Sequence, residues 1–263
     1  MVVAIYATIV VQIELSVTRS ADPVAVTGIT KELDMTLVAA AADGLEGLDG
    51  MAEFLDRRSD DLTQMLVEHL AVVAVSVAVA TVVGVALGLL VWDRPVGRSV
   101  TITTAAVILT IPSLALLAIL SPLFGLGWGP SIVALVLYSL LPIVRNTVVG
   151  LREVPAPVLE SARGMGMTRT GVLLRIQLPM AWPIILTGIR VATQLAIGIA
   201  AIGAYVAGPG LGQYIFRGLS SLGSRNALNY ALSGTVGVVA LALAADALFI
   251  VIARLTTPRG LRA

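Results

Sequence analysis

The sequence contains no cysteine and only one histidine, His69. Without cysteine the chain cannot form a disulfide, a thiolate metal site or a cysteine nucleophile. A single histidine leaves almost no material for a histidine-based triad or a metal cluster. We therefore expect no catalytic residue, no metal and no other cofactor in this chain, and a membrane-embedded enzyme is a distant alternative.

Charged residues are also scarce: they make up 13% of the 263 residues, and the formal net charge is +1. The arginines are spread over several segments and form no basic stripe, which argues against a nucleic-acid partner. Aromatic residues amount to 5%, too few for an obvious cage around a quaternary ammonium group inside the apolar segments. No Walker A sequence occurs, so the chain is not itself a P-loop ATPase.

Apolar residues are abundant: 57% of the chain is hydrophobic and the mean hydropathy is +0.97. Such a composition is typical of an integral membrane protein with several helices, each of which needs about 20 apolar residues to cross a bilayer. Five runs of this kind are expected to be spans, and they cover about 64–92, 100–124, 131–149, 180–206 and 227–253. Pro112 is expected to kink or break the second span, and the third contains Pro142.

The first 62 residues differ from the rest. The segment Met1–Val17 is apolar but contains Gln12 and Glu14, so whether it forms a sixth span stays open. The following residues are acidic. We expect residues 1–62 to be a poorly ordered or partly helical extension, with a regulatory or partner-binding segment as the alternative. Residues 63–259 are expected to form the membrane domain, and 260–263 a short tail.

A polar segment separates the third and fourth spans. A short helix is expected from Val158 to Met165, ended by Gly164 and Gly166, because glycine readily adopts the left-handed conformation that follows many helices. Thr168 suits the N-cap of a second helix, which we expect Pro179 to stop. A helix–turn–helix displayed between two spans is typical of a docking surface, not of a catalytic centre.

Arginine is concentrated on one side of the expected membrane. With five spans, the first link, the polar segment and the C-terminal tail share a side, and they contain Arg94, Arg98, Arg152, Arg163, Arg169, Arg175, Arg254, Arg259 and Arg262. The short loops on the other side contain only Arg217 and Arg225. Because cytoplasmic loops are enriched in Lys and Arg, the polar segment and the C-terminus are expected in the cytoplasm.

Four residues within the expected spans are candidates for an ion pair, a pathway or a gate. Arg190 and Asp246 have similar depths and are a candidate ion pair, because an unpaired charge in hydrocarbon is costly. The pair could fix helix register or lie on a transport pathway. Arg145 and Asn146 lie near the cytoplasmic end of the third span, where snorkelling and a gate or coupling-loop contact are both open. His69 is expected to be a simple interface residue.

A glycine-rich stretch, Gly208-Pro-Gly210-Leu-Gly212, follows the fourth span. It superficially resembles a phosphate-binding loop, but no strand precedes it and no Gly-Lys-Ser/Thr follows, so nucleotide binding is not expected. A re-entrant or external turn is the better interpretation. The three glycines are therefore candidates for an outer gate.

The polar segment resembles a known family motif. Glu160-Ser161-Ala162, three residues, Gly166, nine residues, Ile176, one residue and Leu178-Pro179 together resemble the EAA loop of binding-protein-dependent ABC importer permeases. Ser161 stands where the family usually has alanine. Four further stretches resemble the permeases for glycine betaine, carnitine and choline: TIPSLALLAIL (110–120), LYSLLPIVRNT (137–147), ARGMGMTR (162–169) and GPGLGQYIFRGL (208–219). The resemblance extends over roughly residues 54–259, and family members usually start near Met51.

This resemblance implies an all-α integral membrane protein with the type-I ABC importer permease (MetI-like) fold, about five core transmembrane helices and a cytoplasmic coupling helix. The coupling loop would be residues 151–179, and the residues that contact the ATPase would be Glu160, Ser161, Ala162, Arg163, Gly164, Gly166, Met167, Thr168, Ile176, Leu178 and Pro179.

The resemblance also implies partners and a location. These are two ABC ATPase subunits that hold the ATP and Mg²⁺, an external substrate-binding protein, and a second permease copy in a homodimer or similar heterodimer, within the lipid of a bacterial plasma membrane. The solute would be glycine betaine, choline or carnitine. The alternatives are an importer for another small solute, such as an amino acid, and a self-contained secondary transporter or channel in which Arg190 and Asp246 carry ion coupling.

Overall fold

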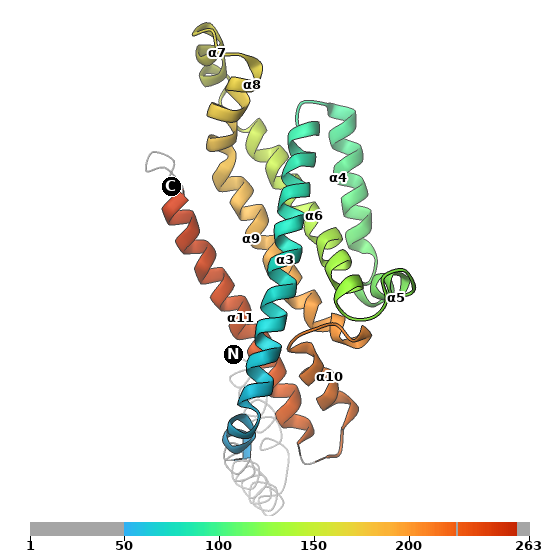
Figure 1. Ribbon diagram of the computed structural model, residues 1–263. Helices are drawn as coiled ribbons and strands as arrows, with labels where there is room; N and C mark the ends of the chain where they lie inside the picture. Colours follow the sequence, from blue (N-terminus) through green and yellow to red (C-terminus); the bar gives the residue numbers. More distant parts are fainter. Residues whose placement is uncertain (1–49, 225, 257–263) are drawn as a thin grey trace, which may run out of the picture. The chain divides into compact units, whose positions relative to one another are not determined.

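The computed structural model describes residues 50–224 and 226–256, and within these ranges every regular element is a helix (Figure 1). The all-α prediction is confirmed for this part of the chain. The chain divides into two units, 1–57 and 58–263. The described part of the first unit is helical over 50–57, with an ion pair between Glu53 and Arg57 one turn apart. The sixth-span question at Met1–Val17 and the tail at 260–263 lie outside the described residues.

Four helices in the described ranges are long and apolar enough to cross a membrane, and a bent pair of helices would make a fifth crossing. The four are α3 (Ser59–Val91), α6 (Trp128–Arg152), the helical run Arg169–Val206 and α11 (Ala227–Thr256); the bent pair is α4 (Pro95–Thr110) and α5 (Ser113–Phe124). The boundary expected after residue 62 falls inside the first turn of α3, where Asp60 and Asp61 complement the helix dipole.

The bent pair turns by 97° at Pro112. The residue before a proline is pushed towards an extended conformation, and Ile111 accordingly has φ −67° and ψ 128°. The carbonyl group of Ile111 accepts a hydrogen bond of 2.8 Å from the Tyr138 hydroxyl of α6. The break is therefore stabilised from a neighbouring helix. Pro142, by contrast, lies inside the continuous helix α6.

The core of the second unit is formed by α3, α6 and α9 (Leu178–Gly203), where Val72, Ile143 and Ile185 are each 0% exposed. Glycines allow these helices to approach closely. A Cβ atom added at Gly88 of α3 would lie 2.5 Å from Thr147 Cγ2 of α6. Such close packing through small residues is the usual way in which helices associate inside a membrane.

The second helix of the polar segment is not stopped by Pro179, and that expectation is wrong. α8 (Arg169–Val172) continues into a π-helical turn at Leu173–Gln177 and then into α9. In the π turn the Leu178 amide donates to the carbonyl of Leu173, five residues earlier. A proline lacks an amide hydrogen and clashes with the carbonyl four residues before it, and the wider turn relieves that clash. The coupling loop and the fourth span therefore share one helical path.

The two ends of this path carry different structures. α7 (Ala156–Gly164) and α8 lie at one end of α9, and α10 (Gly212–Ser220) lies near the other end (Figure 1). A short 3₁₀ turn, Ala204–Val206, and the left-handed residue Ala207 lead from α9 towards α10. α10 packs mainly against α11.

Candidate functional site

The turn after α7 is a Schellman motif centred on Gly166. The Met167 amide donates to the Ala162 carbonyl at 3.2 Å, and the Gly166 amide donates to the Arg163 carbonyl at 2.9 Å. Gly166 has φ +83°, a conformation that glycine adopts without steric cost. Gly164 is the last residue of the helix and Gly166 supplies the left-handed position. The sequence therefore specifies this turn residue by residue.

The next helix begins at a capped residue. Thr168 has an extended backbone, and its hydroxyl oxygen accepts a hydrogen bond of 3.2 Å from the Gly171 amide. This is the usual geometry of an N-cap. Arg169, the first residue of α8, forms an ion pair with Asp93 in the turn between α3 and α4. The sequence does not reveal this contact, because 76 residues separate the two partners.

Most of the expected coupling residues are exposed. Glu160, Ser161, Arg163, Gly164, Gly166, Thr168 and Pro179 are exposed, Met167, Ile176 and Leu178 are half-buried, and Ala162 is buried. Among their neighbours, Met165 is 77% and Leu174 is 53% exposed. A hollow of about 370 Å³ is lined by Met167, Thr168, Thr170, Gly171, Leu174 and Arg175. Exposed apolar side chains beside a hollow, rimmed by polar residues, are typical of a protein-binding surface.

The structure brings Arg190 and Asp246 together. The Arg190 Nε and Nη2 atoms donate to the two carboxylate oxygens of Asp246, each at 2.7 Å. Two further hydrogen bonds join α9 and α11: Gln194 Nε2 donates to the Ala242 carbonyl at 3.1 Å, and Trp182 Nε1 donates to Thr256 Oγ1 at 3.0 Å. A bidentate arginine–carboxylate pair fixes both distance and orientation. The geometry suits the register interpretation of the pair.

Arg145 and Asn146 face different surroundings. Asn146 donates a hydrogen bond of 2.8 Å to the Pro142 carbonyl within α6 and lies against Gly188 of α9. Arg145 is exposed, and no partner for it occurs within 50–224 or 226–256. The two candidates therefore do not form one site.

His69 is not an interface residue, and that expectation is wrong. It is 0% exposed, and its Nε2 atom lies 3.1 Å from the Ile197 carbonyl oxygen of α9. The sequence held a signal, because His69 shares a helical face with the buried residues Val72, Val73 and Ser76. One buried hydrogen bond of this residue therefore joins α3 to α9.

The glycine-rich stretch packs tightly against these same helices. A Cβ atom at Gly210, which has φ +107°, would lie 2.6 Å from His69 Cβ. A Cβ atom at Gly208 would lie 2.6 Å from the Gly203 carbonyl oxygen, and one at Gly212 would lie 2.0 Å from that of Ala201. All three glycines are therefore needed for the backbone to lie directly against His69 of α3 and the C-terminal end of α9.

An aromatic cluster at the same end was not foreseen. The rings of Tyr214 and Tyr230 meet edge to face with centroids 5.1 Å apart. The Arg217 guanidinium lies 5.7 Å from the first ring centroid and 5.4 Å from the second. Burial raises the pKa of the Tyr214 hydroxyl above its usual value, and nearby Asp61 adds to this rise. Arginine therefore already interacts with these two rings.

Comparison with known proteins identifies the family. Residues 71–257 match the model of the binding-protein-dependent transport system inner membrane component. The chain belongs to this family. It is accordingly a multi-pass membrane protein and the permease component of a transport system. As the family description states, these transport systems depend on a binding protein.

Several curated relatives resemble almost the whole membrane domain. The choline transport system permease protein OpuBB of Bacillus subtilis is 38% identical over 212 residues, covering 81% of this chain and 96% of the relative. The glycine betaine/carnitine/choline permease protein OpuCB of the same organism is 38% identical over 215 residues, covering 82% and 97%. The osmoprotectant import permease protein OsmW of Salmonella typhimurium is 36% identical over 206 residues, covering 76% and 94%.

A solved structure shows the same fold. An inward-facing form of the MetNI methionine ABC transporter superposes with a TM-score of 0.67 at 24% identity, covering 75% of this chain and 96% of that chain. At this sequence identity the similarity is evidence for the fold alone. The prediction of a type-I importer permease bundle is confirmed.

Proposed function

We propose that this chain is the membrane subunit of an ATP-driven importer for a quaternary-ammonium compatible solute, namely glycine betaine, choline or carnitine. Relatives of 36–38% identity that bear these solutes or the word osmoprotectant in their names support this proposal. Their similarity also favours an importer over a self-contained secondary transporter. In the proposed complex, two such subunits surround the pathway, and an external binding protein delivers the solute.

The observation that carries the mechanism is the single helical path from α8 through the π turn into α9. In the proposed mechanism, the exposed α7–α8 surface seats on an ABC ATPase at the cytoplasmic face. Closure of the two ATPases around ATP and Mg²⁺ displaces this surface. Because α9 packs in the core against α6 and α3, a displacement of α8 reorients the core helices. ATP binding shifts the equilibrium only if the ATPase contacts differ between the two states.

The test is solute uptake into proteoliposomes that contain the permease, its ATPase and its binding protein. Radiolabelled glycine betaine, choline and carnitine are tested one at a time, with and without ATP. ATP-dependent uptake of at least one of them supports the proposal. Uptake that needs no ATPase and follows an ion gradient contradicts the class of transporter, whereas ATP-dependent uptake of other solutes only contradicts the substrate class.

Two valine variants test the coupling surface. Gly164 and Gly166 both have open space where a Cβ atom would lie, but only Gly166 has a positive φ. A left-handed backbone costs roughly 1–2 kcal/mol for a residue with a side chain and more for a β-branched one, so Gly166→Val should lower uptake about tenfold. Gly164→Val is the matched control for backbone strain. It also adds a side chain to the expected contact surface, but Gly164 lies in the helix, where valine is roughly a few tenths of a kcal/mol more favourable than glycine, so its effect on uptake should be clearly smaller. Equal effects of the two variants would contradict the role of this turn.

A further inference from the structure

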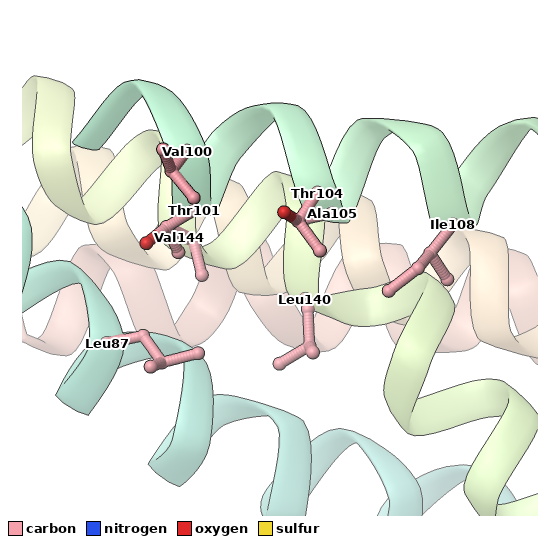
Figure 2. Close-up of a pocket in the computed structure, with 8 residues that line it drawn as sticks. All are labelled: Leu87, Val100, Thr101, Thr104, Ala105, Ile108, Leu140 and Val144. Carbon is pink, nitrogen blue, oxygen red and sulfur yellow. The ribbon is translucent and has the colours of Figure 1, made fainter. Parts of the chain in front are cut away.

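A groove on the surface of the second unit lies between α3, α4 and α6 (Figure 2). Its volume is about 230 Å³, and its walls consist of six apolar side chains and two threonines. They are Leu87, Val100, Thr101, Thr104, Ala105, Ile108, Leu140 and Val144. No carboxylate and no aromatic ring lines the groove, so it offers nothing that attracts a quaternary ammonium solute. The groove therefore does not fit the solute of the proposed importer.

The groove follows one face of α4. Thr101, Ala105 and Ile108 recur at the spacing of a helical face, and Arg98 lies on the same face one turn earlier. From Arg98 to Ile108 the helix rises roughly 15 Å. This length is about half of the roughly 30 Å hydrocarbon core of a bilayer. The groove therefore begins within two residues of Arg98, at Val100, and reaches to about the depth of the bilayer centre.

The charged end of the groove carries two arginines. Arg98 is half-buried and Arg94, the N-cap residue of α4, is exposed. Within the described ranges neither arginine forms an ion pair. The nearby carboxylate, Asp93, is already paired with Arg169. Arg94 and Arg98, which have no ion-pair partner among the described residues, thus lie at the end of α4 that we expect at the membrane–water boundary. The apolar groove begins beside them.

We propose that the α3–α4–α6 groove binds an anionic phospholipid. One acyl chain lies along Thr101, Ala105 and Ile108, and the phosphate group pairs with Arg98 and Arg94. An arginine guanidinium binds phosphate through two parallel hydrogen bonds, and basic residues beside a span attract anionic headgroups. Because α4 leads into the break at Pro112, a bound lipid would link α4 of the bent pair to α3 and α6.

The test measures which lipids remain on the purified complex. The complex is placed in nanodiscs of equal phosphatidylglycerol and phosphatidylcholine, extracted in mild detergent and analysed by native mass spectrometry. We expect phosphatidylglycerol to be retained over phosphatidylcholine by about tenfold, since each basic residue near the surface contributes to the preference. Equal retention of the two lipids by the wild type would overturn the proposal. If glycerol phosphate, which has no acyl chains, displaces phosphatidylglycerol from the complex, the proposed contact between the acyl chain and the groove would be overturned.

Three variants locate the site. Arg94→Gln with Arg98→Gln should abolish the preference, and Thr104→Phe should lower retention of both lipids by filling the groove. Arg152→Gln is the matched control, because it removes an exposed arginine at the end of α6 outside the groove. A preference that survives the double variant, or that Arg152→Gln lowers equally, would contradict the assignment. Thermal unfolding in detergent tests whether each variant is folded. If a variant is not folded, the comparison of phosphatidylglycerol with phosphatidylcholine on the wild type still decides whether the groove prefers anionic lipid.

Discussion

The contact between α3 and α6 leads to a prediction whose size can be worked out. Gly84 and Gly88 of α3 face Ile143 and Thr147 of α6, one helical turn apart on each helix. An alanine Cβ atom at residue 88 would lie 2.5 Å from Thr147 Cγ2 and 2.7 Å from Thr147 Cβ. Carbon atoms in contact are normally about 3.5–4.0 Å apart. Gly88→Ala therefore forces the two helices apart by about 1 Å.

Two opposing terms set the effect on the free energy of unfolding. Adding a methyl group to a closely packed core costs about 1–3 kcal/mol, because neighbouring contacts are lost when the helices separate. Alanine recovers up to about 1 kcal/mol relative to glycine through its higher helix propensity. We therefore expect a net loss of about 0–2 kcal/mol for Gly88→Ala. In the control Gly198→Ala no atom lies within 4 Å of the new Cβ, so only the gain applies. The two variants should differ by about 1–3 kcal/mol.

Unfolding of the purified protein in mixed micelles, followed by tryptophan fluorescence, measures this difference. Trp92 caps the end of α3 one turn from residue 88 and reports on this contact. Gly88→Val should unfold at still lower denaturant than Gly88→Ala, because its larger side chain deepens the overlap. If Gly88→Ala is as stable as Gly198→Ala, the helices are not in contact at this point and the packing argument is wrong.

Three other tests address contacts described above. Asp246→Asn leaves its arginine partner on α9 without a counter-charge inside the membrane, so the yield of folded protein should fall severalfold; a fully stable and active variant, measured by size-exclusion profile and uptake, would refute the pairing. Reversing the Asp93–Arg169 pair one residue at a time should lower uptake per ATP hydrolysed about twofold, as expected for an exposed ion pair, and the double reversal should restore it; no recovery in the proteoliposome assay would refute a role for the pair. Gly210→Ala should lower the thermal unfolding temperature by several degrees more than Gly223→Ala, since both glycines have a positive φ but only Gly210 lacks space for a Cβ atom; equal shifts would refute the packing of this turn.

The features that the sequence predicts depend on local chemistry. The apolar runs predict helices long enough to cross a bilayer, the proline at 112 predicts the break, and Gly166 and Thr168 predict the turn and the cap. Each of these depends on a few neighbouring residues. The similar depths of Arg190 and Asp246 even predict a contact between distant helices, because charge inside a membrane has few alternatives to pairing.

The features that the sequence did not reveal depend on the surroundings of a residue. Burial of His69 requires both Ile197 and the glycine-rich turn, which are far away in the chain. The continuation of the helix through Pro179 depends on a π turn, which has no reliable sequence signal. Gly84 and Gly88 of α3 have the spacing of a known helix-packing motif, but only the structure shows that they pack against α6.

The three polar links between α9 and α11 have a consequence for motion. An apolar helix in a bilayer can slide or rotate against its neighbour in small steps, because its contacts have little directionality. Trp182, Arg190 and Gln194 bind α11 at three successive levels, each through bonds with fixed direction. A slide of a single residue would break all three at once. We therefore expect α9 and α11 to move as one rigid piece, so that in the proposed mechanism a displacement of α8 would also move α11.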